Sequence, residues 1–175
     1  MLSHIVAIDR MGGISKNNEL PWDLPEDRAR MWRRTLELGE AILISRSTRE
    51  QIPRTKLPLP TYIWVRHASP EDYKRLADNE KFVFNLEKFL QTHLDTNFVA
   101  LGGSTLYKRT LALGLVSLVD LTYIDYDFGT DRDTRYPLHP LKRNAYFGTP
   151  TLLEKHKENN YKITQYLYDA SQKAY

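Results

Sequence analysis

The 175-residue sequence contains no cysteine. This absence excludes disulfides, thiolate zinc sites and thiol nucleophiles together, and it fits a reducing compartment. The chain also has no apolar run of about 18 residues, and its first ten residues, MLSHIVAIDR, are not a basic start followed by a long apolar stretch. We therefore expect a soluble, cytoplasmic protein that does not bind a membrane.

Several catalytic motifs are also absent. The sequence has no Gly-x-Ser-x-Gly, so nucleophilic hydrolysis has no support, and the triplet at Asp127–Gly129 lacks the catalytic-loop sequence of a kinase. The acidic residues after residue 124 lack the glycine and the terminal glutamate of a calcium loop. We interpret them as a solvated, turn-forming run and predict no metal; they are Asp125, Asp127, Asp131 and Asp133.

The composition, 41% hydrophobic and 27% charged, is typical of a globular protein, and the length favours one domain spanning residues 1–175. The net charge of +3 is mildly basic, and arginines cluster within 28–34 and 46–54. An anionic small ligand fits this pattern better than nucleic acid does. We expect a monomer that binds a small molecule.

Strand-like and helix-like segments alternate along most of the chain. Apolar, often β-branched runs predict strands at 4–8, 41–45, 61–65, 81–84, 97–101 and 117–124. Helical spacing or caps predict helices at 25–35, 47–51, 69–76, 86–92 and 104–112. The alternation predicts an α/β fold with helices on both faces of a mostly parallel sheet. Residues 125–150 look turn-rich, and 151–156 with 161–170 predict a closing antiparallel hairpin joined by KENN.

One carboxylate falls where an apolar side chain is expected. Read as a helix from Pro25, the segment puts Asp27 in a row with Leu24 and Met31 and turns Arg30 elsewhere. An ionised carboxylate removed from water needs a cation or hydrogen-bond donors, or else takes up a proton. Its partner need not be protein, so Asp27 is a candidate ligand-binding residue.

Strand ends carry the candidate anion site. In FVALGGSTLYKRT a buried strand ends in Gly102 and Gly103, and a helix begins at Ser104 or Thr105. This strand–glycine–helix junction would bind a phosphate group; the alternative is an ordinary tight turn. It is neither a three-glycine dinucleotide fingerprint nor a P-loop. Two other strand ends would supply cations or hydroxyls to the same anion: Arg46, Ser47 and Thr48 after one strand, and Arg66 and His67 after another. His67 alone also fits a solvated loop.

The loop DRMGGISKNNELPW links the first strand to the helix of Asp27. It is polar, contains glycine and ends with Leu20 and Trp22, as a mobile lid over a site would. The alternative is a merely long connection.

Five stretches, taken together and in order, resemble the dihydrofolate reductase family: IVAIDRMGGISKNNELPWDLPED, ILISRSTREQI, FVALGGSTLY, VDLTYID and DTRYP. The most specific elements are the Leu-Pro-Trp loop followed by Asp27, the Gly-Gly pair and Thr122. The resemblance implies a central, mainly parallel eight-stranded sheet with about four flanking helices and a C-terminal antiparallel hairpin. It also implies NADPH-dependent reduction of 7,8-dihydrofolate to 5,6,7,8-tetrahydrofolate, with hydride transferred to C6 and N5 protonated by water near the lid.

The resemblance also assigns site residues. Asp27 would bind the pterin, with Thr122 bonded to that acid, while Trp22 would hold a bridging water and Leu20 would close over the nicotinamide. The other substrate-binding positions would be Ile5, Val6, Arg28, Met31, Ile52, Leu57, Leu101 and Tyr107. The cofactor-binding positions would be Ala7, Ile14, Ser15, Leu20, Ser45, Arg46, Ser47, Thr48, Arg66, His67, Gly102, Gly103, Ser104, Thr105 and Leu106, with a cis peptide between the two glycines.

The sequence departs from the family at the substrate tail. Aligning Leu57 and Pro58 with the family's Leu-Pro puts Pro60 where an arginine normally clamps the folate glutamate. Arg28 is a surrogate anchor or a solvated helix arginine. The departure keeps two alternatives open: a reductase of another pterin or of a ribosylated pyrimidine, and a weakly active scaffold with a binding role. Ser15 and Met31 also stand where the family commonly has a glycine and an aromatic residue.

Overall fold

A computed structural model describes residues 1–53, 55, 57–138 and 140–172. Its eight strands form a single sheet. The strands are β1 (Leu2–Ile8), β2 (Ala41–Ser45), β3 (Thr61–Trp64), β4 (Glu80–Val83), β5 (Phe98–Ala100), β6 (Val116–Ile124), β7 (Thr151–Glu158) and β8 (Tyr161–Asp169). The helices are α1 (Pro25–Leu38), α2 (Arg46–Gln51), α3 (Pro70–Lys74), α4 (Leu86–Gln91), α5 (Ser104–Ala112) and α6 (Pro140–Phe147), with short 3₁₀ turns η1 (Arg132–Thr134) and η2 (Ala170–Gln172).

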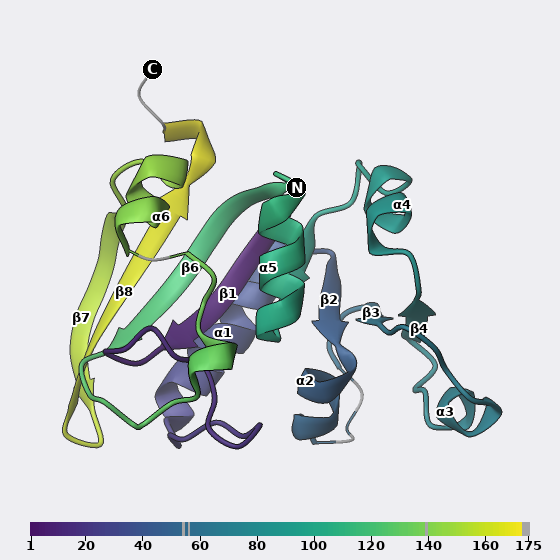
Figure 1. Ribbon diagram of the computed structural model, residues 1–175, viewed down its shortest axis with the longest axis horizontal. Helices are drawn as coiled ribbons and strands as arrows, with labels where there is room; N and C mark the ends of the chain where they lie inside the picture. Colours follow the sequence, from purple (N-terminus) through teal and green to yellow (C-terminus); the bar gives the residue numbers. More distant parts are fainter. Residues whose placement is uncertain (54, 56, 139, 173–175) are drawn as a thin grey trace.

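The sheet has the order β4-β3-β2-β5-β1-β6-β8-β7 (Figure 1). The first six strands in this order run parallel, whereas β8 is antiparallel to both β6 and β7. The predicted mainly parallel sheet with a C-terminal antiparallel hairpin is therefore confirmed. Because parallel strands end at the same edge of a sheet, the loops after β1, β2, β3 and β5 all leave the sheet on one side.

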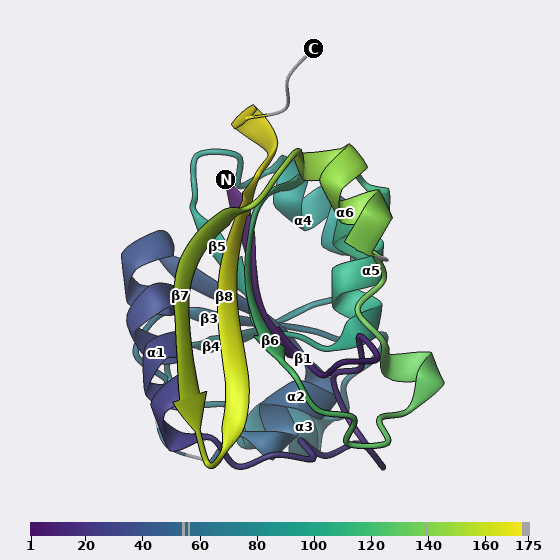
Figure 2. The same cartoon turned by 90° about the vertical axis from the view of Figure 1, so that its left-hand side faces the viewer.

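Helices cover both faces of the sheet, as predicted. Figure 2 shows α1 on one face and α4, α5 and α6 on the other. The central strands need this cover because successive side chains point to opposite faces: Ala41 through Ile44 of β2 are all buried. One core cluster includes Leu43 and Val119, and a second, on the other face, includes Ile42 and Ile63.

Local sequence explains several element ends. The fixed φ of Pro25 suits the first turn of α1. Ser45 ends β2 and caps α2, since its side chain accepts from the Thr48 amide. The β7–β8 turn needs only Asn159 and Asn160, whose positive φ angles of 49° and 66° suit a two-residue hairpin turn. The expected KENN connection is therefore shorter, because Lys157 and Glu158 belong to β7.

Residues 125–150, predicted to be turn-rich, also contain helical structure that the sequence did not indicate. This segment contains η1 and the helix α6, and about four flanking helices become six over the described residues. Tertiary packing stabilises α6: Phe147 is fully buried, and the buried Arg143 guanidinium lies 5.6 Å from the Tyr168 ring centroid on β8. Prolines and a glycine in the sequence obscured this helix, although a proline at its start is compatible with a first turn. No described helix is both long and apolar enough to cross a membrane.

Candidate functional site

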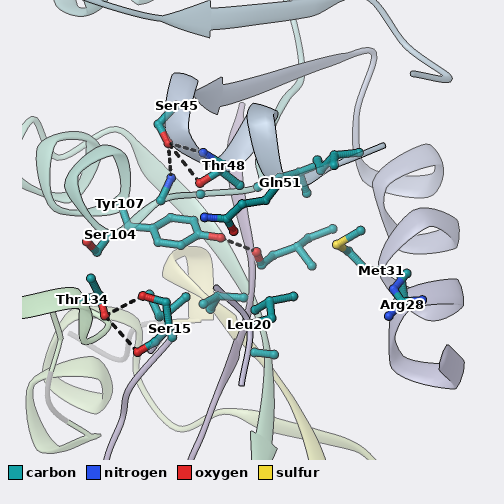
Figure 3. A pocket seen from close by; sticks show the side chains of 18 of the residues that line it. Ser15, Leu20, Arg28, Met31, Ser45, Thr48, Gln51, Ser104, Tyr107 and Thr134 are labelled. Carbon is teal, nitrogen blue, oxygen red and sulfur yellow. Dashed lines mark hydrogen bonds between the residues drawn. The ribbon is translucent and has the colours of Figure 1, made fainter. Parts of the chain in front are cut away.

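A cavity of about 400 Å³ opens at the edge of the sheet where the parallel strands end (Figure 3). Its walls come from β1, the 14–22 loop, α1, α2, the β5–α5 turn and β6. It brings together most of the residues predicted from the sequence: Ile5, Val6, Ala7, Ile14, Ser15, Leu20, Trp22, Asp27, Arg28, Met31, Ser45, Ser47, Thr48, Ile52, Leu101, Gly102, Gly103, Ser104, Thr105, Tyr107 and Thr122.

Asp27 lies half-buried in the wall of this cavity. Its Oδ1 accepts a hydrogen bond of 2.9 Å from Thr122 Oγ1 on β6. Over the part of the chain that the structure describes, no lysine, arginine or histidine nitrogen lies within 4.0 Å of its carboxylate. Burial raises the pKa of Asp27, against the opposing effects of the Thr122 hydrogen bond and the Arg30 charge. The acid is therefore poised to accept further donors from a ligand.

Arg30, the α1 arginine whose charge lowers the pKa of Asp27, is already paired. Arg30 is buried and its Nη2 lies 2.8 Å from Asp120 Oδ1 on β6, while Arg34 Nε donates to Asp120 Oδ2 at 2.7 Å. The expectation that Arg30 turns away from the row of Asp27 was wrong. A fully buried Asp120 carboxylate needs cations, and this requirement overrides the simple apolar stripe of α1.

The glycine turn faces the same cavity from the other side. The Gly102–Gly103 peptide is cis, as the resemblance implies, and the Gly103 amide donates to Ser45 Oγ at 2.8 Å. A Cβ at Gly103 would lie 3.1 Å from Thr48 Oγ1 of α2, so the close approach of α2 to this turn favours glycine. Among the described residues no side chain caps the N-terminus of α5. Its first amides are free to bind an anion.

Tyr107 connects α5 to β1 at the cavity floor. Its hydroxyl donates to the Ile5 carbonyl at 2.6 Å, and burial raises its pKa, so it stays a donor. Behind it the His4 ring lies 4.6 Å from the Tyr107 ring, centroid to centroid. His4 Nδ1 lies 2.8 Å from Tyr136 Oη and Nε2 lies 2.8 Å from Thr110 Oγ1. Burial lowers the pKa of His4 to about 3, so this imidazole is neutral.

The 9–22 loop is fastened at its base and along its middle. At its base, the buried Asp9 carboxylate accepts from the Gly13 amide at 2.9 Å and from Thr130 Oγ1 at 2.9 Å. Further along, Ser15 Oγ donates to Thr134 Oγ1 at 2.8 Å (Figure 3). The Asn17 backbone amide donates to Asp131 Oδ2, and the Gln51 side chain of α2 donates from Nε2 to the Asn18 carbonyl. Asp131 thus does more than form a solvated turn.

Five predicted residues do not line the cavity: Arg46, Leu57, Arg66, His67 and Leu106. Leu57 and Leu106 are buried in the core, whereas Arg66 and His67 are exposed beyond the end of β3. Arg46 lines a separate hollow of about 290 Å³ beside α3. Two basic strand ends nevertheless meet, since Arg46 Nη2 donates to the His67 carbonyl at 2.6 Å.

The cavity also contains residues that the sequence did not single out as binding residues: Asn18, Leu24, Arg30, Trp32, Gln51, Pro53 and Thr134. Leu24 belongs to the same α1 row as Asp27 and was recoverable from helical spacing. Thr134 and Gln51 come from segments far from the glycine and acid motifs, and only the folded chain brings them to the lid.

The sheet order and this cavity place the chain among α/β enzymes that bind a ligand outside the carboxyl ends of parallel strands. The sequence pattern of the family described as dihydrofolate reductase matches residues 1–170. The chain belongs to this family, a family of oxidoreductases.

Named relatives agree with this assignment. The dihydrofolate reductase of Buchnera aphidicola subsp. Schizaphis graminum is 30% identical over 138 residues, which are 78% of each chain. The Mycobacterium tuberculosis dihydrofolate reductase is 29% identical over 148 residues, 85% of each chain. A solved dihydrofolate reductase from Enterococcus faecalis, complexed with NADP(H) and RAB-propyl, shares the fold with a TM-score of 0.72 at 22% identity, covering 97% of this chain and 95% of that chain.

Proposed function

We propose that this protein reduces 7,8-dihydrofolate to 5,6,7,8-tetrahydrofolate with NADPH. The observation that carries the proposal is the half-buried Asp27 carboxylate, held by Thr122 and facing the cavity without a cation from the described chain. A carboxylate in this state suits a ligand that brings paired N–H donors, as the amino group and adjacent ring nitrogen of a pterin do.

The cofactor residues fit NADPH. The uncapped start of α5 and the glycine turn suit its pyrophosphate, and the cavity wall at Ala7 and Ile14 suits its nicotinamide. When bound, NADPH supplies the hydride that is added to C6 of the substrate. Arg46, Arg66 and His67 would favour a 2′-phosphate and so NADPH over NADH.

The chain's own residues orient the substrate and control the proton. Asp27 fixes the pterin, and its negative charge favours protonation at N5. Trp22, buried against Phe128 with ring centroids 5.3 Å apart, would hold the bridging water. Leu20, 56% exposed on the lid, would cover the nicotinamide and exclude bulk water.

A direct test is the loss of absorbance at 340 nm with NADPH and dihydrofolate, for the wild-type protein and for Asp27→Asn. We expect turnover in the wild type and a turnover rate about 100-fold or more lower in Asp27→Asn, because the neutral side chain of the variant cannot favour protonation of N5. Thr164→Val on β8, away from the cavity lining, serves as a control for handling and folding. Absence of wild-type turnover would reject the proposal and leave the two alternatives, a reductase of another pterin or ribosylated pyrimidine and a weakly active scaffold.

A second candidate substrate is a dihydropterin without the glutamate tail. Pro60 offers no side-chain donor at the family's carboxylate clamp, which is the observation that favours it. Comparing kcat/KM for dihydrofolate and a tail-less dihydropterin decides between the two. A higher value for the tail-less compound would reassign the natural substrate.

A further inference from the structure

The first turn of α1, which carries Asp27, is not capped by the side chain of its own N-cap residue. The N-cap residue Leu24 has no side-chain acceptor, so the first amides of the helix need partners from elsewhere. Glu158, at the end of β7, supplies them: its Oε1 accepts from the Glu26 amide at 2.7 Å and its Oε2 from the Asp27 amide at 3.2 Å.

Glu158 is built into this position. It is 6% exposed, and the next residue, Asn159, donates from Nδ2 to the Asp23 carbonyl at 2.9 Å. A buried carboxylate is stable here because the positive end of the α1 dipole and two amides compensate its charge. Its two oxygens bind consecutive amides, so they fix both the position and the rotation of the turn from which Asp27 projects.

We propose that Glu158 is a positioning residue for Asp27, fixing the helix turn that carries the acid and placing a second negative charge beside it. The inference rests on the proposed reductase function for its kinetic consequences, whereas the positioning itself is a property of the free protein.

The charges around Asp27 define what each variant changes. Asp27 faces Arg30 of α1, Thr122 and Asp120 of β6, and Glu158 of β7. The charges of Glu158 and Asp120 add to the effect of burial and raise the pKa of Asp27, whereas Thr122 and Arg30 lower it.

Glu158 has charged neighbours of its own. The carboxylates of Glu26 and Glu158 and the His156 imidazole each offer an atom within 4.8 Å of the others. Glu158→Gln keeps an amide oxygen for the helix and removes the charge. Glu158→Ala removes both.

The decisive measurement is the titration of the Asp27 carboxyl carbon by NMR in the ligand-free protein. We expect Glu158→Gln to lower its midpoint by about half a pH unit. Glu158→Ala should show the same shift and also a several-fold higher KM for dihydrofolate, because the turn is no longer held.

Two controls isolate the role of Glu158. Glu154→Gln changes an exposed acid on the same strand, and His156→Asn removes the nearest imidazole; both should leave the Asp27 midpoint unchanged. Amide hydrogen exchange in the wild-type protein tests the two hydrogen bonds of the cap without any substitution. We expect slow exchange at the Glu26 and Asp27 amides.

Rapid exchange at both amides, or an unshifted Asp27 midpoint in a folded Glu158→Gln protein, would overturn the inference. If the midpoint shifts but the wild type does not reduce dihydrofolate, the positioning role stands and the proposed function fails. The two ideas are therefore tested separately.

Discussion

Arg46 is held between Asp72 and the main chain after β3. Its Nη1 lies 3.6 Å from Asp72 Oδ2, its Nη2 donates to the His67 carbonyl, and its guanidinium lies 5.7 Å from the Phe82 ring centroid. Asp72 belongs to the capping box of α3, and hydrogen bonds from Ser69 lower its pKa, so it stays anionic. The arginine expected at the cofactor phosphate thus shares its charge with a carboxylate.

Replacing Asp72 with Asn should therefore strengthen the preference for NADPH. The variant removes an anion that competes with a 2′-phosphate for Arg46, and we expect the KM for NADPH to fall about threefold at low salt while that for NADH is unchanged. Steady-state kinetics with each cofactor measures the ratio. Glu71→Gln, which changes an exposed acid of the same helix, is the control; equal changes for both cofactors would contradict the prediction.

Removing the Thr122 hydroxyl should shift the titration of Asp27 in the direction opposite to Glu158→Gln. The Thr122 hydrogen bond favours the ionised acid and lowers its pKa, so Thr122→Val should raise the Asp27 midpoint. NMR titration of the Asp27 carboxyl carbon in the ligand-free variant measures this midpoint directly. Thr122→Ser keeps the donor and should match the wild type; a downward shift in Thr122→Val would be inconsistent with this geometry.

Arg28 lines the cavity and forms an exposed ion pair of 2.5 Å with Asp23. If it anchors the glutamate tail, Arg28→Leu should raise the KM for dihydrofolate about tenfold and leave that for a tail-less dihydropterin unchanged, because only the former has a carboxylate to lose. Arg33→Leu, an exposed arginine of the same helix, is the matched control. Equal effects on both substrates would rule out the anchor.

His4 should make the fold sensitive to acid. Its pKa of about 3 in the folded protein lies below the ordinary histidine value of 6.5, so only the unfolded chain binds this proton between those values. The stabilisation is complete above pH 6.5 and is lost as the pH falls toward 3, at up to about 1.4 kcal/mol per pH unit.

The variant His4→Leu should lose this slope. It leaves the Tyr136 and Thr110 hydroxyls without the imidazole, so we expect it to be less stable by about 2 kcal/mol at pH 8. Between pH 6.5 and 5, however, its free energy of unfolding should change less than that of the wild type. Urea unfolding at several pH values measures both, and parallel curves would exclude His4 as the source.

Local patterns were sufficient for the parts of the fold that local physics controls. The runs around Ile42 and Val119 are apolar because both faces of the sheet are covered, and the Ser45 cap follows from its side chain. The helix α6 could not be predicted this way, because it depends on packing of Phe147 and Arg143 against distant strands.

In the candidate site, too, the residues marked by local sequence were predicted, and those placed by long-range contacts were not. Asp27 and the Gly102–Gly103 turn stand out because each conflicts with an ordinary helix or strand, which marks a functional demand. The partners of α1 could not be predicted from its own sequence. Arg30 forms an ion pair with Asp120, and the cap of the helix comes from Glu158, over a hundred positions away. Long-range charge pairing leaves no periodic signal.

The placement of β8 between β6 and β7 has a consequence for biosynthesis. A nascent chain that has emerged as far as β6 already contains the lid, Asp27 and the glycine turn, but the strands that complete the sheet and the acceptor for the α1 amides are still inside the ribosome. Assembly of a complete pocket therefore waits until β7 and β8 have emerged.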